Sequence, residues 1–344
     1  MGARIAVVGD YEGIIGPSEP VQRLRARADV DSVDVYSDPI ERDAIVSTLA
    51  PYQVVIAIRE RTPFPADIVG ALPDLELISQ AGTHAAHVDL PAAAAQGLMV
   101  PCGPADPSAG PSPSLMPELV FGMLLSLLRD LGPLQQEMAA GGWPPSVGRS
   151  LRGRTLGILG LGRHGRAVAA VARLHGMHVV AWGPTLTAER AAASDVEHVA
   201  ELDDMLPRCD VLSVHLKLSD LSRGLIDDRR LGLLPSHAVI INTARGAIVD
   251  EDAMVARLAD GRLGGAGLDV FVTEPLPADH PIRALSNVVL TPHVGFTVDR
   301  NLEEFASDTV GHVEAYLDGR LDPKVLLNPD AATVERARLG SLAG

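Results

Sequence analysis

The chain has little cysteine and no long uninterrupted apolar segment. Cysteine occurs only at Cys102 and Cys209 among 344 residues, which supports neither a disulfide framework nor a cysteine metal site, and we expect no metal. No apolar run approaches the ~20 residues of a transmembrane helix, and the run that follows Met1 is too short for a signal peptide. We therefore expect a cytoplasmic protein that does not contact a membrane.

Positive charge and aromatic side chains are also scarce. Lysine and arginine number 29 against 44 acidic residues, a formal net charge of −15. Binding of nucleic acid requires clustered basic residues, so we expect no nucleic-acid partner. An acidic protein can still bind a small anion through one local arginine, because nearby charges outweigh screened distant ones. Aromatic residues make up 3% of the chain, and no pocket for a bulky aryl substrate is obvious.

Two series of short β-branched runs alternate with amphipathic segments rich in alanine and leucine. This alternation is typical of α/β proteins with parallel sheets, and the length favours two domains. The pattern predicts two Rossmann-like or flavodoxin-like domains, each a parallel sheet flanked by helices. The first series comprises residues 5–9, 33–36, 54–58, 77–79 and 99–101, and the second comprises residues 155–159, 178–182, 211–215, 238–242, 265–268 and 288–291.

A segment rich in proline and glycine, residues 103–114, separates the two series and is predicted to be a linker or surface loop. Apolar residues at helical spacing then predict a helix over residues 117–140, with a stop at Gly141 and Gly142. A second helical segment, residues 298–317, returns the chain to the first series. For residues 330–344 the sequence does not distinguish an ordered helix from a loose end.

A glycine-rich turn lies between the predicted strand at residues 155–159 and a helix predicted over residues 166–175. Its sequence is Gly160-Leu-Gly162-Arg163-His164-Gly165. Such a motif alone is a weak signal, but its position between a strand and a helix predicts a dinucleotide site. Gly160 makes the tight turn, Gly162 lets a pyrophosphate approach the backbone, and Gly165 lets helix and strand pack closely.

The second strand of this domain lacks the acidic residue that usually binds the adenosine ribose. No Asp or Glu occurs from residue 166 to residue 188, so nothing there repels a 2′-phosphate and NADP is permitted. Two interpretations remain open. Either Thr185, Thr187 or Arg190 donates to a 2′-phosphate, or the adenine is merely covered by side chains and NAD binds through the remaining contacts. The strand ends in Trp182, Gly183, Pro184 and Thr185.

Three polar residues follow successive strands near the end of the chain. Each of them alone has an ordinary interpretation: Arg245 as a surface charge, Glu274 as a solvated loop carboxylate, His293 as a core histidine. Their coincidence at strand ends beside a dinucleotide turn indicates a site that reduces a keto acid. An arginine can hold a carboxylate with two parallel bonds, a histidine can transfer a proton near neutral pH, and a carboxylate can orient that histidine and keep it protonated.

With these motifs the chain resembles the D-isomer-specific 2-hydroxyacid dehydrogenase family. The resemblance extends from the first predicted strand through residues 59–64, 141–143, the glycine turn and the three catalytic segments to residues 325–328. It implies an NAD(P)-dependent 2-hydroxyacid dehydrogenase whose active site lies in the cleft between the domains. His293 is then the acid/base, Glu274 its partner and Arg245 the anchor of a small 2-oxo or D-2-hydroxy acid.

The resemblance also implies domain boundaries and further binding residues. Residues 1–116 plus 296–344 would form the substrate-binding (catalytic) domain, and residues 117–295 the NAD(P)-binding Rossmann domain. A homodimer is implied, with the region around Trp143 at its interface. Besides the glycine turn and the end of the second strand, the cofactor residues would be His215, Thr243, Ala244, Asp269 and Gly295, and the substrate residues Arg59, Gly82, Thr83 and His84.

Several alternatives accompany this expectation. His84 stands where relatives place glycine or another small residue, so it either contacts the substrate or is a solvated loop histidine. The main alternative function is a nucleotide-sensing binding protein of the C-terminal-binding corepressor type, which shares the fold. A formate dehydrogenase is disfavoured because that branch pairs its histidine with glutamine, whereas Glu274 is a carboxylate.

Overall fold

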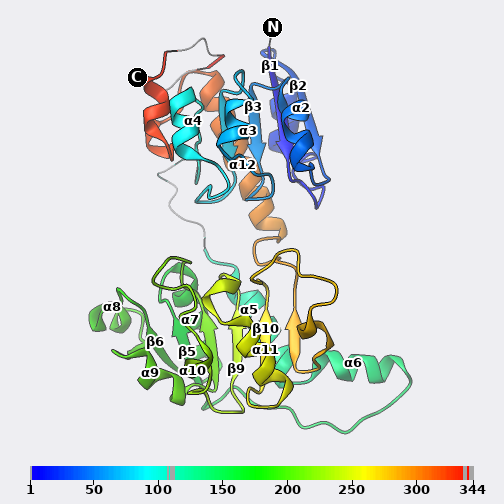
Figure 1. Ribbon diagram of the computed structural model, residues 1–344, viewed down its shortest axis with the longest axis vertical. Coiled ribbons are helices and arrows are strands. Elements are labelled where there is room, and N and C mark those ends of the chain that lie inside the picture. The colour runs from blue at the N-terminus through cyan, green and yellow to red at the C-terminus, as the bar shows by residue number, and fades with distance from the viewer. Residues whose placement is uncertain (1, 107, 109–112, 336–338, 341–344) are drawn as a thin grey trace. The chain divides into compact units, whose positions relative to one another are not determined.

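The computed structural model describes residues 2–106, 108, 113–335 and 339–340. The chain forms two compact units (Figure 1). Unit 1 comprises Met1–Ser112 together with Thr297–Gly344, and unit 2 comprises Pro113–Phe296. Both units are parallel sheets flanked by helices, so the predicted α/β class is confirmed.

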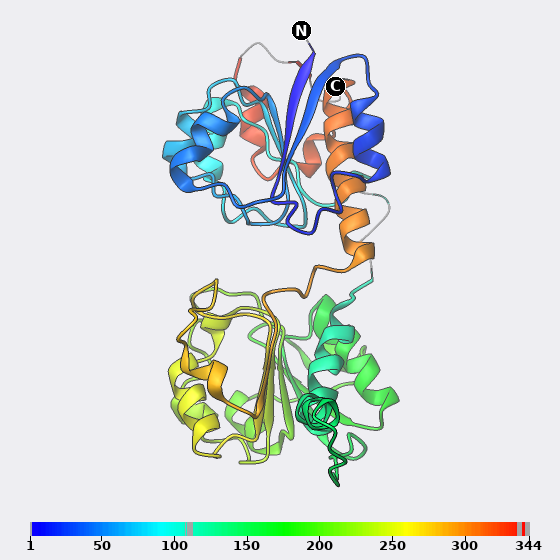
Figure 2. The ribbon, with the colours of Figure 1, turned by 90° about the vertical axis from the view of Figure 1, so that its right-hand side faces the viewer.

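Unit 1 contains a four-stranded parallel sheet in the order β2-β1-β3-β4. Its strands are β1 (Ala3–Val8), β2 (Val30–Tyr36), β3 (Val54–Ala57) and β4 (Leu77–Gln80). Side chains alternate between the two faces. Ile5 and Val7 pack in one core with helices α1 (Glu19–Arg25) and α12 (Asp299–Leu317). Ala6 and Val8 pack in the other with α2 (Ile45–Leu49), α3 (Ala66–Gly70) and α4 (Leu90–Gln96), and Figure 2 shows these two helical layers.

The fifth strand expected in unit 1, at residues 99–101, does not form as a regular strand. Met99 and Cys102 make isolated parallel bridges to β4, and Pro101 makes an antiparallel bridge to Leu326. Pro101 has no N–H group with which to continue a ladder. The Asn328 side chain completes the pairing, because it accepts from the Val100 N–H at 3.0 Å and donates to the Leu98 carbonyl at 2.8 Å.

Unit 2 contains a seven-stranded parallel sheet in the order β11-β10-β9-β8-β5-β6-β7. Six of its strands were predicted, and their bounds agree to within one residue. The two-residue strand β7 was not predicted, because it contains no apolar run. The strands are β5 (Thr155–Leu159), β6 (His178–Trp182), β7 (Glu197–His198), β8 (Val211–Val214), β9 (Val239–Asn242), β10 (Gly265–Leu268) and β11 (Val288–Leu290).

Helices cover both faces of this sheet (Figure 2). One face packs against α5 (Met116–Leu128) and α7 (Arg163–Leu174). The opposite face packs against α9 (Leu202–Met205), α10 (Asp228–Leu231) and α11 (Glu251–Ala259). The short elements are α8 (Ala188–Ala192) and the 3-10 helices η1 (Arg42–Ala44), η3 (Leu206–Arg208), η4 (Gly246–Ile248), η5 (Pro281–Ala284), η6 (Pro323–Val325) and η7 (Pro329–Thr333). In the described part of residues 330–344, the 3-10 helix η7 is the only regular element.

The prediction of a single helix over residues 117–140 is wrong. The segment forms two helices, α5 and α6 (Leu131–Ala139), and Asp130 between them has a left-handed φ of 51°. Pro133 explains the break, because proline has no N–H for a preceding carbonyl and is tolerated only in the first turn of a helix. Gly141, with φ of 84°, follows the end of α6 as expected. None of the α6 residues is buried, and the helix projects from the sheet of unit 2 in Figure 1.

Candidate active site

The glycine turn lies where the strand order of unit 2 reverses. The chain runs outward from β5 to β6 and β7, then returns to β8 on the other side of β5. Ligands of open α/β sheets bind at such a switch point, beyond the carboxyl ends of the strands. Helix α7 begins at Arg163, earlier than the predicted start, with Gly162 as its N-cap. The N–H groups of this helix start can therefore face an anion.

The three glycines have different local requirements. Gly160 has φ of 95°, and its N–H donates to the Trp182 carbonyl at 2.8 Å. A Cβ on Gly165 would overlap the Gly160 carbonyl oxygen, so close packing of helix and strand requires glycine there. A Cβ on Gly162 would meet nothing within 4 Å. The fold therefore does not require glycine at Gly162, which leaves close approach of a ligand as the reason for it.

Two histidines flank this turn, and both are held as neutral imidazoles. His164 Nδ1 lies 2.7 Å from the Ser114 hydroxyl, and His215 Nε2 lies 2.8 Å from the Ser213 hydroxyl. Burial and the neighbouring His164 lower the pKa of His215 to about 3. Burial, with a smaller effect of the Arg163 charge, also lowers the pKa of His164. Neither ring therefore carries a positive charge at neutral pH.

The end of β6 shows no carboxylate at the positions predicted for the adenosine ribose. Gly183 follows the strand, and Pro184 and Thr185 are exposed. The Arg190 guanidinium donates to the Thr185 carbonyl at 2.8 Å, so a positive charge lies beside this segment. The hydroxyl of Thr187 caps α8 by accepting from the Arg190 N–H at 3.3 Å.

His293 and Glu274 form a hydrogen-bonded pair on the loops that follow β11 and β10. His293 Nδ1 lies 2.7 Å from Glu274 Oε2, and Glu274 Oε1 accepts from the Phe271 N–H at 2.9 Å. Burial raises the pKa of Glu274, but these hydrogen bonds and the charge of Arg245 outweigh it and hold the pKa below its usual value. The carboxylate is therefore ionised at neutral pH, and it can stabilise a protonated imidazole.

The turn that carries His293 is held by the carboxylate of Asp269, which was predicted as a cofactor residue. Asp269 is 1% exposed, at the end of β10. Its Oδ1 accepts from the Thr291 hydroxyl at 2.5 Å and the Val294 N–H at 2.8 Å, and its Oδ2 accepts from the Gly295 N–H at 2.8 Å. These donors surround His293, whose φ of 56° is unusual for a residue with a side chain.

Arg245 lies in the turn after β9, beside the turn that carries Glu274. The backbone of Gly246 packs directly on Phe271, where a Cβ would overlap the carbonyl carbon of that residue. Asn242 orders the turn: its side chain accepts from the Ala244 N–H and donates to the Arg245 carbonyl, both at 3.0 Å. Arg245 also donates to the Ala244 carbonyl at 2.6 Å. Sequence reasoning gave Asn242 and Gly246 no role, because contacts within and between these turns leave no periodic signal in the chain.

Thr243 supplies an observation that fits a bound ligand. Its side chain is 8% exposed, and its hydroxyl oxygen is buried with no hydrogen-bond partner among the described residues. A buried hydroxyl without a partner is costly, and an external donor or acceptor would satisfy it. The neighbouring glycine turn and the open space at Gly162 fit a dinucleotide. Among the residues that the structure describes, no group of histidine, cysteine and acidic side chains is arranged to hold a metal.

In unit 1 the predicted substrate residues lie together at the carboxyl ends of β3 and β4. Gly82 has φ of 106°, and a Cβ on it would overlap Nη1 of Arg59, so the guanidinium lies against the Gly82 backbone. Thr83 is exposed. His84 Nε2 lies 2.7 Å from Glu60 Oε1, which sequence reasoning did not identify as a site residue.

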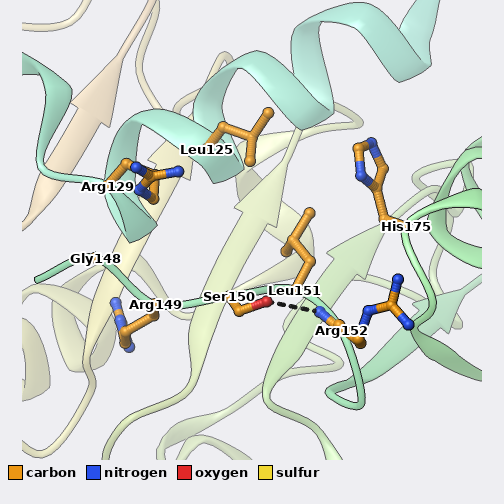
Figure 3. A pocket seen from close by; sticks show the side chains of 8 residues that line it. All are labelled: Leu125, Arg129, Gly148, Arg149, Ser150, Leu151, Arg152 and His175. Carbon is orange, nitrogen blue, oxygen red and sulfur yellow. Dashed lines mark hydrogen bonds between the residues drawn. The ribbon is translucent and has the colours of Figure 1, made fainter.

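A hollow of about 350 Å³ in unit 2 contains none of the predicted site residues (Figure 3). It lies beside the start of β5 and the end of α7, at the amino end of the parallel strands. Its basic lining comprises Arg129, Arg149, Arg152 and His175. Ligands of such sheets bind at the opposite edge, and the candidate active site is therefore assigned there.

None of the described helices has both the length and the apolar character that crossing a membrane requires.

Comparison with known proteins identifies both units. The D-isomer specific 2-hydroxyacid dehydrogenase NAD binding domain matches residues 121–295, and the catalytic domain of the same family matches residues 11–110. A D-3-phosphoglycerate dehydrogenase of Mycobacterium leprae is 33% identical over 307 residues, which cover 88% of this chain and 56% of the relative. The D-3-phosphoglycerate dehydrogenase of Rattus norvegicus is 35% identical over 258 residues, which cover 74% of this chain and 47% of the relative.

The chain spans about half the length of the curated relatives it matches. Its similarity to solved structures extends over whole chains. A phosphoglycerate oxidoreductase of Vibrio cholerae O395 has a TM-score of 0.82 and 30% identity, and the match covers 91% of this chain and 98% of that one. A formate dehydrogenase of Granulicella, at 24% identity and a TM-score of 0.79, shares the fold. Both domain matches and the motifs agree, and the chain belongs to the D-isomer specific 2-hydroxyacid dehydrogenase family.

Proposed function

We propose that the chain is an NAD(P)-dependent 2-hydroxyacid dehydrogenase that interconverts a 2-oxo acid and a D-2-hydroxy acid. The observation that carries this proposal is the pair formed by His293 and Glu274, with 2.7 Å between Nδ1 and Oε2. The pair stands at the carboxyl edge of the sheet that also holds the glycine turn. A positioned acid/base beside a dinucleotide turn is what reduction of a carbonyl requires.

His293 transfers the proton of the reaction. Its Nδ1 faces Glu274, so Nε2 is the nitrogen that reaches the substrate. In reduction the imidazolium donates a proton to the keto oxygen while a hydride reaches the carbonyl carbon. A bound nicotinamide cofactor supplies that hydride, and takes it up in the reverse direction. In oxidation neutral His293 accepts the hydroxyl proton, and the Glu274 carboxylate stabilises the imidazolium that forms.

Arg245 anchors the substrate, because its planar guanidinium can hold the carboxylate and carbonyl oxygens with parallel bonds. Holding both groups presents one face of the carbonyl and gives the reaction its stereochemistry. In unit 1 the substrate residues are Arg59, Gly82, Thr83 and His84, and the backbone of Gly82 and Thr83 offers N–H groups to a carboxylate.

The glycine turn would hold the cofactor, with the pyrophosphate at the helix start formed by Gly162, Arg163 and His164. The residues that would hold the nicotinamide end are His215, Thr243, Ala244, Asp269 and Gly295. The residues that would hold the adenosine end are Trp182, Gly183, Pro184 and Thr185. Because this segment has no carboxylate and Arg190 lies beside Thr185, the site accepts NADP as well as NAD.

A second copy of the chain covers the projecting segment around α6. Four large apolar residues there are exposed, Leu131 by 51%, Met138 by 47%, Trp143 by 86% and Val147 by 96%. Apolar groups gathered on one projection favour association. The protein is therefore proposed to be a homodimer, and sedimentation of the wild type against Trp143→Ser tests this. A wild type that sediments as a monomer would contradict it.

The function is tested by following the oxidation of NADH and NADPH, in parallel, with glyoxylate, hydroxypyruvate, pyruvate, phenylpyruvate and 2-oxoglutarate. We expect turnover with at least one of them, and loss of that turnover in His293→Ala. A protein that binds the cofactor but turns over no 2-oxo acid would contradict the proposal and favour a nucleotide-sensing role.

A further inference from the structure

The carboxyl ends of β3 and β4 in unit 1 carry four ionisable side chains. Arg59 and Glu60 follow β3, and His84 and His87 lie in the loop after β4. The electrostatic influence of Arg59, Glu60 and His84 reaches the His87 ring, so the four form one group. We call it the Glu60 cluster.

The backbone of this cluster is held in unusual conformations. Arg59 has φ of 58° and Gly82 has φ of 106°, both in the left-handed region. Non-glycine residues are strained there, and such strain persists at functional sites, where the surrounding structure enforces it. The conformation places the Arg59 guanidinium directly against the Gly82 peptide. The positive charge therefore lies at the loop that the proposed function assigns to the substrate.

Glu60 compensates that positive charge. Its Oε2 lies 3.5 Å from Arg59 Nη2, and its Oε1 lies 2.7 Å from His84 Nε2. The side chains of Arg59 and Glu60 are 13% and 26% exposed, so water screens the pair only in part. The cluster accordingly holds a carboxylate, as well as a guanidinium, beside the loop that the proposed function assigns to the substrate.

His87 adds no positive charge to the cluster. Burial lowers its pKa to about 4, which leaves the ring neutral at physiological pH. Neither ring nitrogen has a hydrogen-bond partner among the described residues, and Phe64 meets the ring edge-on at 6.1 Å between centroids. Arg59 is thus the permanent cation of the cluster, and Glu60 is the anion that balances it.

We propose that Glu60 is a specificity-determining residue that admits 2-oxo acids with an uncharged or cationic side chain and rejects those with a second negative group. The inference rests on the proposed function. That function assigns Arg59 and His84 to the substrate, and Glu60 contacts both of them within unit 1. A distal phosphate or carboxylate would meet the Glu60 carboxylate at short range, where repulsion is strong.

The test compares isosteric substrates that differ by one charge. For 2-oxoglutarate and its amide, 2-oxoglutaramate, kcat/KM is measured in the wild type, in Glu60→Gln and in Glu12→Gln. Glu12 is the matched control: it is 27% exposed, and its Oε1 lies 2.6 Å from Nη2 of Arg61 in the same unit. We expect the wild type to prefer the amide and Glu60→Gln to raise the acid-to-amide ratio by about tenfold to a hundredfold. Glu12→Gln should leave the ratio within about twofold of the wild type.

Two outcomes overturn the inference: a wild type that prefers the acid, or a ratio that Glu60→Gln leaves unchanged while the amide is still reduced. If the wild type reduces no 2-oxo acid at all, the proposed function has failed separately. In that case calorimetry measures Kd for the acid and for the amide in each protein. An acid-to-amide ratio of Kd values that is equal in the wild type and in Glu60→Gln would overturn the inference.

Discussion

The active-site edge of unit 2 and the Glu60 cluster of unit 1 use carboxylates differently. In unit 2, Asp269 and Glu274 accept hydrogen bonds that hold the turn and the ring of His293. In unit 1, Glu60 lies against the Arg59 guanidinium and the His84 ring. By the proposed function, the first set positions the reacting group His293, and by the further inference the second sets the charge that a ligand meets. Substitutions in unit 2 should lower the rate with all substrates, and those in unit 1 should change their ranking.

The largest effect is expected from His293→Ala, which removes the acid/base. Proton transfer by a positioned side chain contributes roughly 10²- to 10⁴-fold, so kcat should fall by that factor while cofactor affinity is retained. Steady-state kinetics and cofactor titration by fluorescence check this. His175→Ala, at the opposite edge of the same sheet, is the control and should keep full activity. Nearly full activity in His293→Ala would refute the assignment.

Asp269→Asn should lower kcat by about tenfold to a hundredfold with every substrate. The amide nitrogen cannot accept from the Thr291 hydroxyl or from the Val294 and Gly295 N–H groups, so the His293 turn loses at least one bond. Asp250→Asn, which alters only the cap of α11, is the control. An effect confined to cofactor Kd, with kcat unchanged, would show that Asp269 serves the nicotinamide rather than the His293 turn.

Two glycine substitutions should separate folding from cofactor binding. Gly165→Ala places a Cβ on the Gly160 carbonyl oxygen, and we expect it to lower the free energy of unfolding by about 1–3 kcal/mol. Gly162→Ala meets nothing within 4 Å, so it should leave stability within about 0.5 kcal/mol and still weaken cofactor binding. Urea unfolding and cofactor titration measure both. Unchanged cofactor affinity in Gly162→Ala would remove the pyrophosphate from this turn.

Glu274→Gln should move the pH dependence of reduction. Reduction needs the imidazolium, which the Glu274 carboxylate stabilises, so the variant should lose reduction at a lower pH than the wild type. The carboxyl has a pKa below its ordinary 4.5 in the fold, so it stabilises the protein above that pH and this contribution is lost as pH falls through the lower value. The variant should therefore lose less stability in acid. Glu251→Gln, whose carboxylate faces His280 at 3.4 Å, is the control. An unmoved pH profile would exclude Glu274 from this role.

Much of the fold followed from local pattern. Short β-branched runs located six strands of unit 2, and the glycine turn lies between the strand and the helix that it was predicted to join. Local pattern failed where pairing or backbone chemistry decided the outcome. Pro133 requires a new helix to begin after Asp130, where the backbone is left-handed. Pro101 prevents a regular fifth strand in unit 1, and the short strand β7 is defined only by its pairing with β6.

The sequence by itself determined the fold class, the glycine turn and the identity of the residue types at the strand ends, because each depends on short-range periodicity and on neighbours along the chain. Only the tertiary structure decided which of those residues meet. Glu274 lies 2.7 Å from His293, which is nineteen positions later in the sequence. Asp269 holds the turn around that histidine, and Glu60 faces His84. Such contacts depend on strand order and loop conformation, which join positions far apart in the chain and leave no periodic signal in it.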